Sequence, residues 1–202
     1  MKKFLALAAV IALFSTAANA QASIEVGYLN PSTVKSATEP VDFTSTTKLN
    51  GAYVGFDYNF KITKNFGIAP GVFYSWATGK NEDGKIDILE DYEKITQQYV
   101  GIPVNLTFGF NLADDMRISV YAGPTFSYGL KDMADDVDLY ENLGELYNKF
   151  NISVGGGFAF DFANDFRINL GYSYGITDRY DAPLLDQTWK RHMLHMGVGY
   201  IF

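Results

Sequence analysis

Residues 166–176 read FRINLGYSYGI, with a large apolar side chain at every second position. Arginine, asparagine, glycine and serine fill the positions between them. Successive side chains of a β-strand point to opposite faces, so a period of two predicts a strand with one large apolar face and one small polar face. This stretch is the clearest case of a pattern that runs through the chain.

Seven further segments after residue 20 repeat the alternation. Phenylalanine and tyrosine, which favour pleated surfaces, supply 30 of the 32 aromatic residues, and the chain has 19 glycines. Together the segments predict an all-β fold of eight antiparallel strands. These strands cover residues 23–28, 52–60, 66–76, 100–110, 117–128, 150–162, 166–176 and 194–202.

The small face of these strands fits the inside of an eight-stranded barrel, and the large face does not. Such a barrel has an interior just wide enough for side chains or one small ligand, and roughly forty large apolar side chains would exceed it. No stretch after residue 20 resembles a transmembrane helix. We therefore predict a membrane-spanning, eight-stranded, antiparallel up-and-down β-barrel whose apolar face meets lipid.

The predicted connections alternate between short and long. Three are short turns, at residues 61–65, 111–115 and 163–165, and four are long, at residues 30–47, 79–95, 131–147 and 178–188. Aromatic residues gather at both levels, with Phe60, Phe108 and Phe166 near the turns and Trp76 and Tyr174 near the long connections. These features are typical of barrels in the outer membrane of a Gram-negative bacterium, with long extracellular loops and both termini in the periplasm.

The first twenty residues have the features of a secretory signal peptide. Lys2 and Lys3 give a positive start, residues 4–14 are apolar, and Ala18-Asn19-Ala20 supplies a small-residue cleavage pattern. The apolar run is shorter than the roughly 17–25 residues that a transmembrane helix needs. We expect cleavage after Ala20 and a single barrel domain over residues 21–202.

Composition narrows the functional classes for the exported chain. Without Lys2 and Lys3 it has 14 basic and 23 acidic residues, a net charge of −9, which argues against nucleic-acid binding. The chain has no cysteine, which excludes a disulfide framework, a thiolate metal site and the acylated cysteine of a lipoprotein.

The last strand resembles the insertion signal of outer-membrane proteins, in which apolar residues alternate before a terminal aromatic residue. The matching residues are Leu194, Met196, Val198, Tyr200 and Phe202. The resemblance implies recognition by the barrel-assembly machinery. Residues 21–202 as a whole resemble the small eight-stranded outer-membrane proteins typified by OmpX and the OmpA barrel domain, and their Tyr-, Phe- and Gly-rich style is similar to the porin-like barrel family of Bacteroidota.

Five charged residues fall on the small, inward face near the turns: Glu25, Asp57, Arg117, Asp161 and Arg167. We predict that they form a hydrogen-bonded ion network across the lumen, because buried charges must be paired. As a structural element, the network would plug and stiffen a narrow barrel. As a functional element, it would be a gate or a proton path. The polar cores expected of small barrels favour the structural role.

Neither histidine stands in a catalytic pattern. In the barrel deacylases that this fold resembles, a histidine lies two residues before a serine, whereas His192 is followed by Met193 and Leu194, and His195 points inward. The acidic segments 80–94 and 131–149 lack the glycine and glutamate spacing of a calcium loop. The sequence therefore predicts no enzymatic activity, no cofactor and no metal site, and a short helix within residues 135–146.

The leading hypothesis is a non-enzymatic outer-membrane barrel with a structural or surface-interaction role, since loops on a rigid scaffold commonly carry binding. Its expected partners are outer-membrane lipids, lipopolysaccharide and an unidentified partner of the loops. A small porin-like channel is the alternative, although aqueous channels belong to barrels of about 16 strands. A lipid-modifying barrel enzyme is the third hypothesis and lacks a recognisable nucleophile and base.

Overall fold

The computed structural model describes residues 20–37, 43–80, 94–142, 144, 147–163, 165–180 and 187–202. Residues 1–19 of the predicted signal peptide lie outside this part of the chain. The described residues form strands and one short helix. They are β1 (Ala20–Ala37), β2 (Phe43–Lys48), β3 (Asn50–Lys61), β4 (Phe66–Lys80), β5 (Lys94–Ala113), β6 (Met116–Ala134), β7 (Val137–Asp138), α2 (Leu139–Asn142), β8 (Phe150–Phe162), β9 (Phe166–Gly175) and β10 (Gln187–Ile201).

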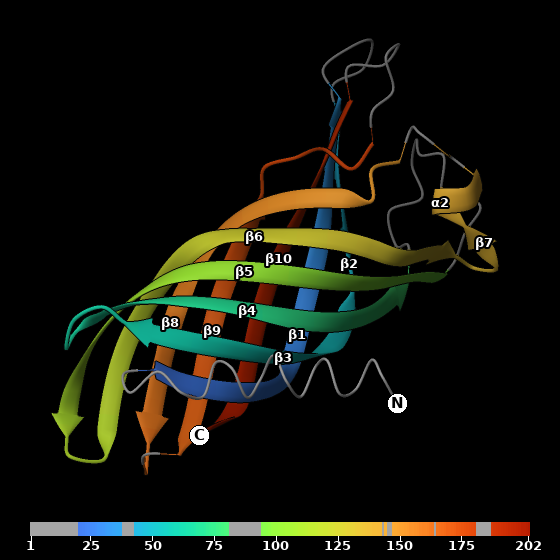
Figure 1. The fold of residues 1–202 in the computed structure, drawn as a ribbon. Coiled ribbons are helices and arrows are strands. Elements are labelled where there is room, and N and C mark those ends of the chain that lie inside the picture. Colours follow the sequence, from blue (N-terminus) through green and yellow to red (C-terminus); the bar gives the residue numbers. More distant parts are fainter. Residues whose placement is uncertain are drawn as a thin grey trace, which may run out of the picture.

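Eight of the strands form a closed antiparallel ring (Figure 1). The pairing follows chain order, from β1 through β3, β4, β5, β6, β8 and β9 to β10. The ring closes because β10 pairs with β1 over the whole stretch from Ser23 opposite Ile201 to Ala37 opposite Gln187. The short strands β2 and β7 are not members of the ring and pair with β1 and β6. The predicted eight-stranded up-and-down barrel is confirmed.

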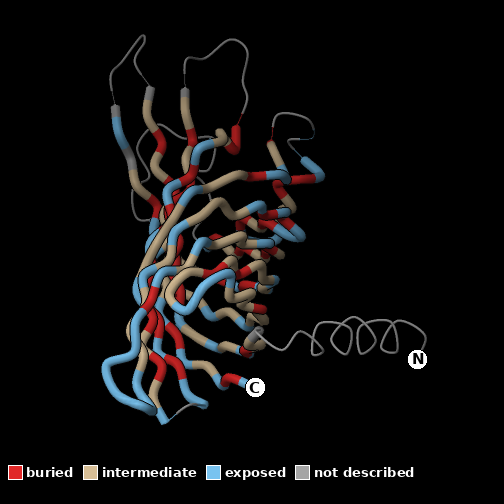
Figure 2. The backbone as a smooth tube through the Cα atoms, turned by 60° about the vertical axis from the view of Figure 1, so that its left-hand side comes forward, coloured by how far each residue is buried: buried red, intermediate tan, exposed pale blue. Residues whose placement is uncertain are grey.

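The two faces of the wall are those that the alternation predicts. On the outer face, Val26, Leu106 and Phe158 are 53%, 51% and 61% exposed, whereas the inward Ser75 and Asn169 are buried. Figure 2 shows exposed and more buried residues alternating along the strands. An apolar surface that encircles a protein is far larger than the patches that water-soluble proteins expose, and it is the surface that lipid solvates. Among the described residues, no helix is long and apolar enough to cross a membrane.

Short connections lie at one end of the barrel and long ones at the other, and we call these the turn end and the loop end. The turn end, at the lower left of Figure 1, holds the predicted turns: β3 ends at Lys61 before β4 begins at Phe66, and β8 ends at Phe162 before β9 begins at Phe166. The loop end carries β7 and α2. Helix α2 lies within residues 135–146, where a loop helix is predicted.

The strands extend further at the loop end than the sequence predicts. Residues 30–37 and 43–47, predicted as part of a long connection, belong to β1 and β2, and β5, β6 and β10 also pass their predicted limits. Burial still alternates there, since Thr33 and Lys35 are buried while Val34 and Ser36 are half-buried. Above the lipid band the outer face need not be apolar, so the alternation in hydropathy ends although the strand continues.

Candidate functional site

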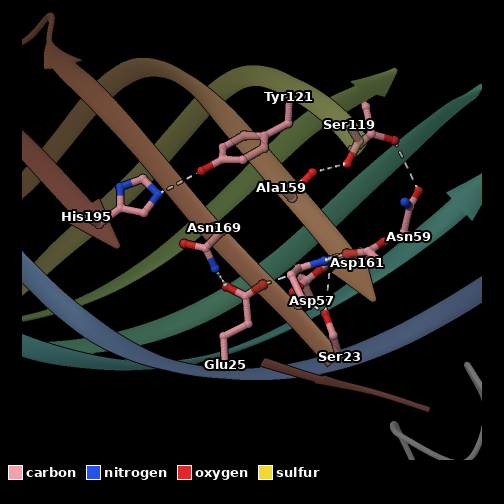
Figure 3. A network of polar contacts seen from close by, with 12 residues as sticks. Ser23, Glu25, Asp57, Asn59, Ser119, Tyr121, Ala159, Asp161, Asn169 and His195 are labelled. Carbon is pink, nitrogen blue, oxygen red and sulfur yellow. Dashed lines mark hydrogen bonds and ion pairs between the residues drawn. The ribbon is translucent and has the colours of Figure 1, made fainter. Parts of the chain in front are cut away.

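Six polar side chains meet inside the barrel near its turn end. We call this cluster the turn-end network, and Figure 3 shows most of it: Ser23, Glu25, Asp57, Asp161, Arg167 and Asn169. Arg167 lies at its centre. Its Nε and Nη2 donate to Asp161 Oδ1 and Oδ2 at 2.6 and 3.1 Å, the two-pronged geometry in which arginine binds a carboxylate most strongly.

The remaining nitrogen of Arg167 faces the other two carboxylates. Nη1 lies 3.4 Å from Asp57 Oδ1 and 3.9 Å from Glu25 Oε1, and it donates to Ser23 Oγ at 3.3 Å. Ser23 in turn donates to Asp57 Oδ2 at 2.6 Å, and Asn169 Nδ2 donates to Glu25 Oε2 at 2.7 Å. Each charged group thus has a partner, as charges held out of water require.

Arg117 does not join the other four charged residues predicted for the lumen. Its guanidinium donates to Asn111 Oδ1 at 3.1 Å and to the Gly109 carbonyl at 3.2 Å. Arg117 stands opposite Asn111 on one side and opposite Asp161 on the other, but both oxygens of Asp161 are already bound by Arg167. The predicted network therefore keeps four of its five charged members, and Arg117 instead ties the β5–β6 turn.

Three ring side chains form a layer on the loop-end side of the network. Tyr53 Oη donates to Asn169 Oδ1 at 3.1 Å. Tyr121 Oη lies 3.0 Å from His195 Nε2 (Figure 3). The rings of Tyr53 and His195 meet edge to face, with centroids 6.1 Å apart. This layer links β3, β6 and β10 across the lumen.

A cavity of about 140 Å³ lies in the lumen beside the network and the ring layer. Glu25, Asp57 and Arg167 border it at the turn end, and Phe73 and Met193 border it toward the loop end. The lumen of this barrel is therefore only partly filled by its side chains.

A second buried polar cluster fills the lumen at the loop end. We call it the loop-end cap: Tyr99, Asp132, Tyr140, Tyr147, Arg179 and Arg191. Arg179 forms an ion pair with Asp132, and these residues are 1% and 0% exposed. Tyr147 and Tyr99 donate to the same carboxylate oxygen at 3.0 and 3.4 Å. The guanidinium of Arg191 lies 4.1 Å from the centre of the Tyr99 ring, at a distance suited to a cation–π contact.

Half of the cap comes from residues outside the ring strands. Tyr140 belongs to α2, Tyr147 precedes β8 and Arg179 follows β9. Gly129 admits Tyr140, because a Cβ at Gly129 would lie 1.7 Å from the Tyr140 hydroxyl. Burial raises the pKa of the Tyr147 phenol well above its usual value, so Tyr147 stays protonated and remains a donor to Asp132.

This cap is not among the clusters that the sequence predicts. Asp132 falls within the acidic segment 131–149, and Arg179 falls within a predicted loop. One signal was available, since Tyr99 keeps the inward parity of Gly101 and Asn105 and so places a large side chain in the lumen. Nothing in the pattern indicates that Arg179 folds back to meet it.

The two histidines have aromatic neighbours. His195 contacts Tyr121 and Tyr53 in the ring layer, whereas His192 packs against Tyr172 and Tyr174, with ring centroids 6.3 and 4.4 Å away. Within the described ranges no serine hydrogen-bonds to either histidine, and no group of three or more histidine, cysteine or acidic side chains gathers as a metal site would.

The residues predicted as an insertion signal line the outer face of β10 and the chain end. Each is at least 42% exposed: Leu194, Met196, Val198, Tyr200 and Phe202. Their role in insertion stays a prediction.

Comparison with known proteins gives a family and a fold. A family model described as "Outer membrane protein beta-barrel domain" matches residues 15–181. Among solved structures, Ail, the attachment invasion locus protein of Yersinia pestis, in complex with the heparin analogue sucrose octasulfate, is 15% identical with a TM-score of 0.50, over 91% of this chain and 99% of that one.

Two other solved barrels are similar in extent. OprG from Pseudomonas aeruginosa is 12% identical with a TM-score of 0.48, over 90% of this chain and 95% of that one. The outer membrane enzyme PagL is 10% identical with a TM-score of 0.48, over 85% and 97%. No curated protein matches the chain. Structural similarity at such low sequence identity indicates a shared fold and does not indicate a shared activity.

Proposed function

Because the chain belongs to the family of outer membrane protein β-barrel domains, we propose that it is a non-conducting, non-enzymatic barrel that presents its loop end to a partner. The observation that carries this proposal is the occupation of the lumen at both ends. The turn-end network bonds four strands to one another, and the loop-end cap is nearly inaccessible to solvent.

The loop end supplies the surface for a partner. In outer-membrane barrels the long connections face the outside of the cell, where loops on a rigid frame commonly carry binding. Strand pairing above the lipid band and the cap beneath the connections make this frame stiff at the loop end.

Lipopolysaccharide is the lipid partner that the charges favour. Lys80 and Lys94 stand opposite each other on β4 and β5, and Lys131 lies on the neighbouring β6, and all three are exposed beyond the aromatic band. Exposed lysines at this height attract the phosphates of surrounding lipid headgroups.

Single-channel recording in a planar lipid bilayer tests the proposal. The purified protein is first shown to be folded by its heat-modifiable gel mobility and is then added to the bilayer, with protein-free detergent as the control. We expect no reproducible current steps. Regular steps of one size would overturn the non-conducting barrel and favour a small channel.

A small channel is the second candidate, and the lumen cavity of about 140 Å³ is the observation that favours it. Conduction would require both the cap and the turn-end network to move aside. In that case current steps would appear in the wild-type protein and would change in size when Arg167 or Asp132 is replaced.

A lipid-modifying enzyme receives less support from the side chains. His192 lies near the lipid face, but its neighbours are the rings of Tyr172 and Tyr174, and a nucleophile needs a base within hydrogen-bond reach. Incubation with labelled lipid A tests this hypothesis, and release of an acyl chain by the wild-type protein would overturn the non-enzymatic assignment.

A further inference from the structure

The lumen cavity has a wall that is largely apolar. Beyond the network at its turn end, its lining includes Leu29, Phe73, Pro103 and Met193. A cavity of roughly 150 Å³ with apolar walls in another protein stays dry and binds benzene, so a volume of about 140 Å³ suits one small ring.

Several polar groups at the cavity bond to one another. Tyr53 donates to Asn169, Asn169 donates to Glu25, and Tyr121 pairs with His195. A buried water typically makes about three hydrogen bonds to groups that lack other partners. Within the described part of the chain, His195 Nδ1 is buried at the cavity without a hydrogen-bond partner, and such a group alone is fewer than the roughly three partners that an ordered water usually has, so the largely apolar lining favours an apolar occupant.

The barrel wall next to the cavity is interrupted in three successive strand pairs. Between β3 and β4 the pairing lapses at residues 58–59 opposite 69–70. Between β4 and β5 it lapses at 71–72 opposite 102–103, and between β5 and β6 at 104–105 opposite 123–124. Each gap contains one proline, namely Pro70, Pro103 or Pro124, and proline has no N–H to donate to a neighbouring strand.

The rest of the wall contrasts with this sector. The pairings of β1 with β10, of β6 with β8 and of β8 with β9 run without a gap along their described lengths. Residues at the gaps, including Asn59, Ala69, Asn105 and Gly123, also line the cavity. On the outside of the same sector Ile102 is 51% exposed to the lipid band. The weakest part of the wall thus separates the cavity from the membrane interior.

We propose that the lumen cavity is a binding site for a neutral, largely apolar molecule about the size of one aromatic ring, which reaches the site from the membrane through the proline-interrupted wall of β3–β6. Such a site needs no aqueous channel through either end of the barrel. It therefore goes beyond the proposed function, and current steps in a bilayer would overturn the non-conducting barrel without deciding whether the cavity binds.

Methionine methyl NMR provides a readout on both sides of the wall. Met193 lines the cavity, whereas Met196 on the same strand faces lipid and is 48% exposed. Protein labelled at the methionine methyl groups, in detergent micelles, is titrated with benzene. We expect a saturable shift of the Met193 methyl resonance, and for Met196 only the small linear drift caused by benzene in the micelle.

Gly55→Leu is designed to fill the cavity. Gly55 lines it, and a Cβ built there lies 3.4 Å from its nearest neighbour, Phe73 Cβ, in ordinary contact, so the added side chain has space only toward the cavity. Val54→Leu is the matched control, because Val54 is the adjacent residue on the lipid face and is 44% exposed. Gly55→Leu should abolish the saturable shift and Val54→Leu should retain it.

A second cavity-filling variant allows the test to be made even if Gly55→Leu does not fold. Thr125 also lines the cavity, and Thr125→Leu should reduce benzene affinity at least tenfold if Gly55→Leu does not fold. A Met193 shift that stays linear, or one that survives filling in a folded variant, would overturn the proposal and leave a water-filled lumen.

Pro103→Val tests the path through the wall. Valine restores a backbone N–H in the β4–β5 gap, so exchange of benzene should slow several-fold while the Met193 shift at saturation stays the same. An exchange rate equal to that of the wild-type protein would overturn the membrane path.

Discussion

The turn-end network and the loop-end cap both hold buried charge, but with opposite balance. In the network, Arg167 faces Glu25, Asp57 and Asp161, one cation against three carboxylates. At the loop end, within the part of the chain that the structure describes, Asp132 lies among the buried cations Arg179 and Arg191 of the cap and the neighbouring Lys35. The lumen is therefore acidic at its turn end and basic at its loop end.

The two clusters also differ in how the chain supplies them. All six members of the network are strand residues at inward positions, so none can leave without unpairing the wall. Arg179 and Tyr147 lie outside the ring strands, so their side chains can be displaced without unpairing the ring. Loss of the network should therefore weaken the whole barrel, whereas loss of the cap should mainly open its loop end.

Arg167→Met should have the largest effect. The substitution keeps much of the side-chain volume but leaves three carboxylates facing one another without a cation. Removing one partner of a buried ion pair typically costs about 3–5 kcal/mol. Urea unfolding in lipid vesicles, followed by tryptophan fluorescence, measures the change in the free energy of unfolding.

Arg117→Met is the control for this measurement, since Arg117 lies at the same end of the barrel and bonds to Asn111 and Gly109 instead of the network. It should cost about 1 kcal/mol, the usual net value of such hydrogen bonds. Equal losses for the two variants would contradict the central place of Arg167.

Asp132→Asn should have the next largest effect, and a different kind of effect. It removes the carboxylate that Arg179 and Tyr147 bind, which we expect to cost about 2–3 kcal/mol because a buried cation loses its partner. Arg179 then keeps its backbone bonds to Trp189 and Asn148 but loses its buried ion pair, so limited proteolysis should cut near residues 176–180 faster while the barrel core stays protected. The exposed Asp136→Asn serves as the control, and unchanged cleavage in Asp132→Asn would contradict a cap that holds the connections.

Tyr147→Phe isolates one hydrogen bond of the cap. The ring still packs against Trp189 and Tyr140, but the 3.0 Å bond to Asp132 is lost. A hydrogen bond to a charged acceptor contributes about 1.5 kcal/mol or somewhat more. The same proteolysis assay should show intermediate cleavage, and cleavage as fast as in Asp132→Asn would mean that the phenol rather than the ion pair holds the connection.

The difference between the clusters also explains what the sequence could reveal. Glu25 and Arg167 are separated by 142 positions, yet both lie at inward-facing positions near the turn end. The closed ring brings residues at the same height of the barrel close together. The alternation of inward and outward positions correctly predicts the face on which these charged residues lie. It does not predict the direction in which a long side chain extends along the strand, and the Arg117 side chain extends toward the turn.

The cap could not be predicted from the sequence, for two physical reasons. Above the lipid band both faces of β1 and β6 carry polar residues, so hydropathy loses its period while the backbone keeps its pairing. Arg179 lies outside the strands, where side chains follow no regular alternation, so its contact with Asp132 cannot be predicted from a sequence pattern. A buried residue between strands is identified from the packing of the folded chain and not from the hydropathy pattern of the sequence.

Tyr53→Phe should have the smallest effect and tests whether the ring layer belongs to the network or only fills space. The substitution keeps the ring that packs against His195 and loses the 3.1 Å bond to Asn169. A neutral hydrogen bond contributes about 0.5–1.5 kcal/mol, and Asn169 keeps its bond to Glu25, so we expect a loss near the lower bound. Combining Tyr53→Phe with Arg167→Met in a double-mutant cycle separates the two possibilities, because coupling appears only between groups that share partners. Additive losses would make the tyrosine a filler, and a smaller combined loss would extend the turn-end network up to the cavity wall.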